Sequence, residues 1–284
     1  MRVRCTNLVS REVDALRSVE AWAAEHVSVG VVSGGGVVAT FGDAAREYRW
    51  ASVTKPVTAL ACLVACEEGT LDLDEPAGPP GSTVRHLLAH ASGLPLDGSS
   101  PIARPGERRI YSDHGFDVLG AALAERAGME FGEYLRGAVV EPLGLGARYD
   151  GRPGSGLHGS LDDLLAIGRE LLAPTLVSPE TLAEATSVQF PGLGGVLPGF
   201  GRQEPNDWGL GPELRNGKSP HWTGARNSPR TFGHFGRSGT FVWADPEAGL
   251  GLCCLTDLEF GEWAASAWPA LSDAVLAETA GEAK

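Results

Sequence analysis

The stretch RWASVTKP, residues 49–56, places a serine and a lysine three positions apart where a helix is expected to begin. Residues three apart on a helix lie on the same face, so the side chains of Ser52 and Lys55 should point the same way. Pro56 lacks a backbone N–H and is tolerated only near a helix start, which predicts the helix N-terminus around Ser52 or Val53. This stretch therefore predicts two adjacent polar side chains at a helix N-terminus.

The chemistry of this pair depends on the second residue being lysine. A serine hydroxyl is a weak nucleophile near neutral pH unless a base lies beside it. A desolvated lysine can lose its proton and act as that base, whereas arginine stays charged. Only Lys55, Lys218 and Lys284 are lysines in a chain whose other cationic side chains are arginines. The pair indicates a nucleophile with a proton partner, although an ordinary surface lysine in a first helical turn explains the spacing equally well by itself.

Two further stretches accompany the pair. PIARPGERRIYSDHGFDVLG, residues 101–120, places Tyr111 and Asp113 before a helical run, and TFGHFGRSGTFVWADPEAGL, residues 231–250, places His234 and Gly236 on an expected strand. In this order the three motifs resemble the Ser-x-x-Lys, Tyr-x-Asn and Lys- or His-x-Gly boxes of the serine β-lactamase and penicillin-binding protein superfamily. The likeness is to its class C branch, with the related DD-carboxypeptidases and esterases. WASVTKPVTAL, EEGTLDLDEP and HLLAHASGLP also look like that family, and the resemblance runs from about residue 28 to 257.

The resemblance implies a catalytic role for three residues. Ser52 is expected to attack a carbonyl group and form an acyl-enzyme, which water then hydrolyses. Lys55 and Tyr111 are expected to handle the proton. The resemblance implies no cofactor and no metal, and the substrate is expected to be a small molecule.

The resemblance also implies substrate-binding residues. The backbone N–H groups of Ser52 and Arg237 would form the oxyanion hole, with Arg237 following the third motif on the edge strand of the sheet. His234 and Gly236 would line the opposite wall, glycine allowing the strand to approach the substrate closely.

Asp113 departs from the family pattern, which usually has asparagine at this position. An amide can donate and accept hydrogen bonds, whereas an ionised carboxylate only accepts. A carboxylate beside Lys55 also favours the charged ammonium and opposes its use as a base. We therefore expect Tyr111 to accept the proton, with Lys55 stabilising the phenolate. Alternatively, Asp113 marks weakened catalysis or a substrate without the usual amide.

The order of expected elements predicts the fold class. Residues 10–26 have the apolar spacing of an amphipathic helix, and VSVGVVSGGGVVATFGD, residues 27–43, indicates a β-hairpin. Three more strands and a helix over about 262–280 follow near the other end. We expect an α+β, β-lactamase/transpeptidase-like fold, with an antiparallel sheet built from both chain ends and flanked by helices. Residues 1–50 with 225–284 would form the sheet lobe and 51–224 a helical lobe, with the active site in the cleft between them. The stretch 191–229 is expected to be a long loop.

Composition limits the functional classes. The net charge is −13 and no cluster of basic residues is evident, which argues against nucleic-acid binding. The apolar runs are too short for a signal peptide or a membrane span, so a cytoplasmic protein without a membrane anchor is expected. The odd count of five cysteines, without paired spacing, argues against a disulfide framework and for a reducing compartment, and Cys62 and Cys66 are expected in the core. His86 and His90 have metal-ligand spacing but lack a third ligand at a typical distance. No feature of the sequence sets an oligomeric state.

The sequence therefore predicts a serine hydrolase that acts on an amide, a lactam or an ester. Two alternatives stay open. One is a binding or regulatory protein that keeps the fold but has lost turnover. Asp113, in place of the usual asparagine, is the reason to consider it. The other is an acyltransferase, in which an alcohol or amine replaces water in the second step.

Overall fold

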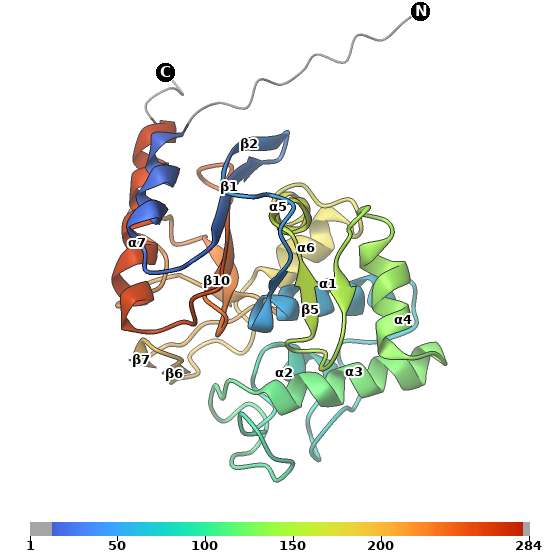
Figure 1. The fold of residues 1–284 in the computed structure, drawn as a ribbon. Coiled ribbons are helices and arrows are strands. Elements are labelled where there is room, and N and C mark those ends of the chain that lie inside the picture. The colour runs from blue at the N-terminus through green and yellow to red at the C-terminus, as the bar shows by residue number, and fades with distance from the viewer. Residues whose placement is uncertain (1–12, 281–284) are drawn as a thin grey trace, which may run out of the picture.

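A six-stranded antiparallel sheet lies at the centre of the computed structural model, which describes residues 13–280 (Figure 1). Its strands run in the order β2-β1-β11-β10-β9-β8. Pairing of β1 with β11, with Val29 opposite Cys254, joins the two ends of the chain and confirms the predicted architecture. The strands are β1 (Val27–Ser33), β2 (Gly36–Phe41), β8 (Glu213–Leu214), β9 (Phe232–Gly236), β10 (Thr240–Asp245) and β11 (Leu250–Thr256).

Both faces of this sheet are covered, which explains why β10 and β11 are apolar along nearly their whole length. One face packs against α7 (Glu262–Ala280) and the N-terminal 3-10 helix η1 (Asp14–Ala21), which lie side by side in Figure 1. The other face packs against α5 (Leu161–Glu170). Residues alternate along each strand between these two faces, so the core is divided into two apolar clusters.

The N-terminal segment forms a 3-10 helix rather than the expected amphipathic α-helix over 10–26, and residues 10–12 lie outside the described range. The apolar residues Val13, Leu16, Val19 and Trp22 are spaced three apart. Three residues per turn bring side chains with that spacing into one line, so the 3-10 form places them together against the sheet and α7.

The helical part of the chain is built around α1 (Thr54–Glu67), whose residues are mostly buried. Cys62 is fully buried on that helix and Cys66 packs beside it, as predicted. Asp113 is the first residue of the third helix rather than lying before it as predicted, because Ser112 caps this helix by accepting the backbone N–H of Gly115 at 2.8 Å. The helices are α1 (Thr54–Glu67), α2 (Val84–Leu88), α3 (Asp113–Ala127), α4 (Phe131–Leu135), the π-helical turn η3 (Arg136–Val140) and α6 (Pro179–Ala185).

The stretch 191–229 is not the continuous loop that its composition indicates. It contains the hairpin β6 (Gly195–Leu197) and β7 (Gly201–Gln203), followed by β8. Because β8 pairs with the first two residues of β9, β8 forms the outer strand of the sheet, and β9 has a free edge only from His234 onward. Strands of two or three residues among glycine and proline carry too few alternating side chains to stand out as strands.

Two elements from the middle of the chain belong to the sheet region: β8 extends the sheet, and α5 packs on β1 and β11. The remaining strands, β3 (Tyr48–Arg49), β4 (Arg148–Tyr149) and β5 (Leu157–Gly159), form a separate small sheet near the start of α1. The division at residues 51 and 224 stays a prediction. Within residues 13–280, no helix combines the length and apolar character needed to cross a bilayer.

Candidate active site

Ser52 lies in a short 3-10 helix, η2 (Ala51–Val53), that leads directly into α1. Ala51 has a φ of +48°, a left-handed conformation that is strained for a residue with a side chain. The preceding Trp50 holds this turn in place, since its indole donates to the carbonyl of Gly159 at 3.2 Å and its own carbonyl accepts from Thr240 at 2.9 Å. The serine is therefore presented on a fixed turn rather than on a flexible loop.

Two side chains from the predicted motifs donate hydrogen bonds to the serine oxygen. The hydroxyl of Tyr111 donates to Ser52 Oγ at 2.8 Å, and Lys55 Nζ donates to the same atom at 3.2 Å. Tyr111 lies just ahead of α3, 59 positions from Ser52, so the fold has brought the first two motifs together. The backbone N–H of Ser52 belongs to the first turn of the helix, where such groups have no intrahelical acceptor.

Lys55 is completely buried beneath Ser52, with 0% of its side chain exposed. Its three ammonium protons match three acceptors: Ser52 Oγ, a carboxylate oxygen of Asp113, and the backbone carbonyl of Gly154 at 3.0 Å. Burial alone would lower the pKa of Lys55, but attraction to Tyr111 and Asp113 outweighs burial and raises that pKa above its ordinary value. The resting site therefore holds a charged Lys55 ammonium, as expected from the aspartate that replaces the family's usual asparagine at position 113.

Tyr111 is held by an aromatic contact as well as by its hydroxyl. Its ring lies 4.7 Å from the buried ring of His90, whose Nδ1 accepts the backbone N–H of Ser112 at 3.1 Å. Burial raises the pKa of Tyr111 above its ordinary value, and Asp113 adds to this effect while the charge of Lys55 opposes it. Tyr111 is therefore a neutral phenol at rest, with the Lys55 ammonium 4.8 Å from its ring centroid.

His234 lines the cavity opposite Tyr111, as the resemblance implies, and it is uncharged. Its Nδ1 donates to the carbonyl of Phe235 at 2.7 Å, which leaves Nε2 as an unprotonated acceptor. Burial, reinforced by the nearby charge of Lys55, lowers the pKa of His234 to about 3. The third motif therefore supplies a neutral aromatic ring where a lysine would supply a cation.

Gly236 and Arg237 lie where β9 meets the serine turn. A Cβ at Gly236 would come within 2.5 Å of the Trp50 carbonyl, so glycine lets the strand abut this turn. Gly236 does not line the cavity, contrary to the expectation that it would approach the substrate. Arg237 does line it, with an exposed side chain, and follows β9 close to Ser52. The oxyanion-hole role of the Arg237 backbone N–H stays a prediction.

The cavity above Ser52 has a volume of about 370 Å³. Its wall includes the predicted site residues. It also includes apolar residues of the β6–β7 segment and Phe260 just before α7, and no sequence motif indicates these apolar residues. The lining residues are Ser52, Leu96, Asp97, Tyr111, Asp113, Leu197, Pro198, Trp208, Glu213, His234, Phe235, Arg237 and Phe260.

The histidine pair with metal-ligand spacing has other roles. His90 accepts from the backbone of Ser112, and His86 Nδ1 hydrogen-bonds the hydroxyl of Thr83 at 2.9 Å. These bonds fix the end of α2 behind Tyr111.

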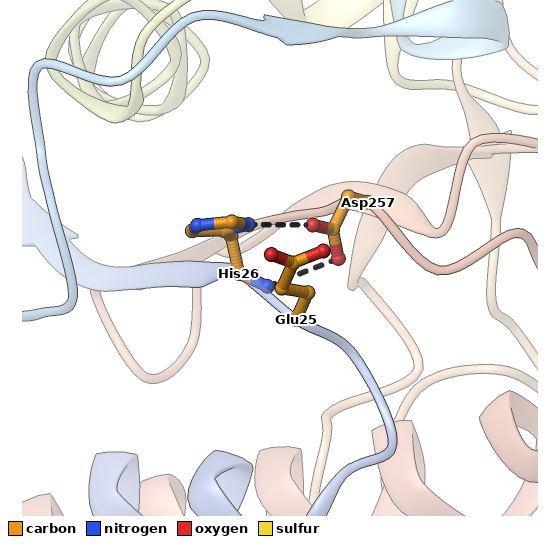
Figure 2. A group of neighbouring side chains, drawn as sticks. All are labelled: Glu25, His26 and Asp257. Carbon is orange, nitrogen blue, oxygen red and sulfur yellow. Dashed lines mark hydrogen bonds and ion pairs between the residues drawn. The ribbon is translucent and has the colours of Figure 1, made fainter.

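A different group of potential metal ligands lies at the end of the sheet, away from the cavity lining. Glu25, His26 and Asp257 have ligand atoms within 4.8 Å of one another (Figure 2). His26 binds Asp257 through both its backbone N–H at 3.0 Å and its ring Nδ1 at 2.8 Å. These contacts join the start of β1 to the end of β11, so the group has a structural role without a metal.

Comparisons with known proteins agree with this geometry. A family model described as beta-lactamase matches residues 19–147 and 145–276. The crystal structure of a beta-lactamase from Mycobacterium bovis is 55% identical and superposes with a TM-score of 0.92, covering 93% of this chain and 99% of that one. Esterase EstB from Burkholderia gladioli is 25% identical over 328 residues, which span 81% of this chain and 82% of the esterase.

A more distant solved structure shares the fold. EstCE1, described as a hydrolase with promiscuous acyltransferase activity, is 20% identical with a TM-score of 0.75, over 93% of this chain and 97% of that one.

Proposed function

Because this chain belongs to the beta-lactamase family, whose relatives include esterases and peptidases, we propose that it is a serine hydrolase acting through an acyl-enzyme on Ser52. One observation carries the proposal: Ser52 Oγ lies at the cavity within hydrogen-bonding distance of both Tyr111 and Lys55, at 2.8 Å and 3.2 Å. A nucleophile, a group that can exchange its proton and a cation that stabilises that group are thereby assembled before substrate arrives.

In the first step, the Tyr111 phenol releases its proton to solvent, and the resulting phenolate accepts the Ser52 proton as Oγ attacks the substrate carbonyl. Lys55 keeps its proton, because all three of its N–H groups are bound, and its charge stabilises the Tyr111 phenolate before that transfer. The oxyanion is stabilised by the backbone N–H groups of Ser52 and Arg237. Tyr111 then returns the proton to the leaving group, and the carbonyl carbon stays attached to Ser52 as an ester.

In the second step, a water molecule replaces the leaving group. Tyr111 takes a proton from the water, hydroxide adds to the acyl carbon, and the proton returns to Ser52 Oγ as the acid departs. The two steps use the same residues in reverse roles, so an alcohol that displaced this water would give acyl transfer instead of hydrolysis.

The test is to incubate the protein with a nitrophenyl ester and with a penicillin, and to follow both turnover and intact mass. We expect turnover of at least one substrate in the wild type and none above background in Ser52→Ala. Release of an ester product only when an alcohol is added would indicate an acyltransferase. Absence of both adduct and turnover with every substrate would support the binding-protein alternative and contradict the proposal.

A further inference from the structure

The two sides of the cavity differ in chemistry. One side carries Leu96, Asp97 and Asp113, which are close together because the backbone N–H of Asp113 donates to the Leu96 carbonyl at 3.0 Å. The other side is formed by an apolar wall, which consists of Leu197, Pro198, Phe235 and Phe260. A substrate bound at Ser52 would therefore have a polar, solvated side and an apolar side.

The apolar wall is rigidly supported from behind. The rings of Phe235 and Phe260 pack 5.0 Å apart, and each packs on the fully buried Trp268 of α7, at 5.7 Å and 5.3 Å. The backbone N–H of Phe260 donates to the carbonyl of Arg237 at 2.8 Å, which ties the wall to the turn after β9. A surface held in this way is formed before the substrate binds, so little ordering opposes the binding of a hydrocarbon group.

The charges of the cavity favour a neutral substrate. The carboxylates that line the cavity have cationic partners: Asp113 pairs with Lys55, Asp97 with Arg152 at 3.2 Å, and Glu213 with Lys218. His234 is neutral at physiological pH. Among the residues that line the cavity, all within the described part of the chain, Arg237 is the one arginine or lysine, and it is exposed. An anionic group deep in the cavity would thus lie near the carboxylates of Asp97 and Asp113, and the buried Lys55 ammonium is already bound by three acceptors.

We propose, building on the acyl-enzyme function proposed above, that the substrate is a neutral ester whose acyl group is a hydrocarbon chain that packs on the apolar wall. The acyl group stays bound through both steps, whereas the alcohol must leave between them. The acyl group, which is retained, therefore suits the apolar wall. The alcohol, which must depart, suits the polar, solvated side with Asp97 and Asp113. A cavity of about 370 Å³ suits a small ester rather than a polymer.

The first test is a substrate series with the wild-type protein. We expect kcat/KM to rise about 15-fold from p-nitrophenyl acetate to p-nitrophenyl butyrate, since each of the two added methylenes contributes about four-fold when buried. The matched anionic substrate is p-nitrophenyl hemisuccinate, whose carboxylate replaces the end of the butyryl chain, and we expect its kcat/KM to be at least about 100-fold below that of the butyrate. A flat or falling series from acetate to butyrate, or a preference for the hemisuccinate, would overturn the inference.

The second test asks whether the apolar wall causes the preference for butyrate over acetate. Phe260→Ala should reduce the butyrate-to-acetate ratio about three-fold, because part of the apolar surface is lost, while Phe260→Leu should largely preserve it. Val37→Ser is the matched control, as Val37 is 45% exposed on β2 and does not line the cavity, and it should leave the ratio unchanged. Equal ratios in Phe260→Ala and the wild type would contradict the assignment to this wall. If Phe260→Ala does not fold, the wild-type substrate series still tests the proposed substrate class.

These results separate the two proposals. Labelling of Ser52 by a fluorophosphonate together with a flat acyl series would refute the substrate class and leave the serine hydrolase intact. Absence of both labelling and turnover would refute the proposed function itself. Sensitivity to the alcohol chain but not to the acyl chain, measured with methyl and hexyl acetates, would place the hydrocarbon group on the leaving side and overturn the acyl assignment.

Discussion

Two buried lysines, each paired with a carboxylate, lie within this molecule and differ in what surrounds them. Lys55 pairs with Asp113, and Lys218 pairs with Glu213 on β8. Both lysine side chains are almost fully buried, at 0% and 1% exposed, whereas Asp113 is 25% exposed and Glu213 is 2% exposed. The two pairs have the same charges but different access to solvent.

The Glu213 carboxylate is fully occupied by protein donors. Besides Lys218, it accepts from His221 Nε2 and from the indole of Trp222, both at 2.8 Å. The backbone N–H of Thr223 donates to His221 Nδ1 at 3.1 Å, and the Nε2–H of His221 donates to Glu213. Burial opposes ionisation, but His221 and Lys218 outweigh it and lower the pKa of Glu213 to about 2.

The comparison shows that a buried ion pair alone does not mark an active site. Asp113 and Glu213 both line the cavity, but the Lys55 pair is set apart by a third partner, the hydroxyl of Ser52, which also accepts from Tyr111. The ammonium of Lys218 instead donates to the backbone carbonyl of Asp207 at 2.6 Å. We therefore assign the first pair to catalysis and the second to holding β8 in place.

The largest expected effect is the loss of activity in Lys55→Met. Removing the charge that stabilises the Tyr111 phenolate should lower kcat/KM for a nitrophenyl ester by about 10³-fold. The melting temperature should change little, because the remaining Asp113 carboxylate can be hydrated from the cavity. Steady-state kinetics and thermal unfolding measure the two effects. Activity within ten-fold of the wild type would remove Lys55 from the mechanism.

Lys218→Met should have the opposite outcome. It leaves Glu213 as an uncompensated charge in the interior, which should reduce the free energy of unfolding by about 3–5 kcal/mol. The kcat of the folded protein should stay within a few-fold of the wild type. Urea denaturation reports the stability, and an ester assay below the transition reports the activity. A severe loss of kcat at unchanged stability would show that the comparison assigns the two lysines wrongly.

Acid should also distinguish the pairs. The pKa of Glu213 is lowered from 4.5 to about 2 in the folded state, so its contribution to stability is present above pH 4.5 and is lost as pH falls from 4.5 to 2. The corresponding decrease in the free energy of unfolding is about 3 kcal/mol. Unfolding free energies measured from pH 6 to 2.5 should show this fall in the wild type, and a smaller one in Glu213→Gln. Equal slopes in both proteins would be inconsistent with the account.

The smallest effect is a shift of the pH–rate profile in Asp113→Asn. Asp113 raises the pKa of Tyr111 and of Lys55, so its removal should move the acidic limb of kcat/KM to lower pH, by about 1–3 units. Tyr111→Phe is the companion variant, and loss of the limb with about 10²–10⁴-fold lower activity would identify Tyr111 as the proton acceptor. An unchanged profile in Asp113→Asn would refute the role given to this carboxylate.

More of the catalytic centre than of its surroundings could be predicted from the sequence. The spacing of Ser52 and Lys55 in SVTK, with Pro56 after it, predicts a shared helix face, and the motif order supplies Tyr111 and Asp113. The sheet could also be predicted, since its strands are long and apolar. These features depend on short-range periodicity and on residue identity, which a sequence displays directly.

The remainder depends on long-range contacts. The carbonyl of Gly154 completes the hydrogen bonding of Lys55, yet a backbone acceptor has no signature in the sequence. The apolar wall brings Leu197 and Phe260 together from segments that are more than 60 residues apart, within a region whose short strands are not periodic. The same reason explains why β8, with only Glu213 and Leu214, was expected as loop.

The most direct test of the central claim is the rate of covalent labelling by a fluorophosphonate, followed by intact mass and peptide mapping. We predict one adduct per chain, located on Ser52, with a rate about 100-fold or more lower in Lys55→Met and unchanged in Lys218→Met. Adduct formation on another residue, or equal labelling rates in the wild type and Lys55→Met, would contradict the assignment of Ser52 and Lys55 as the nucleophile and its electrostatic partner.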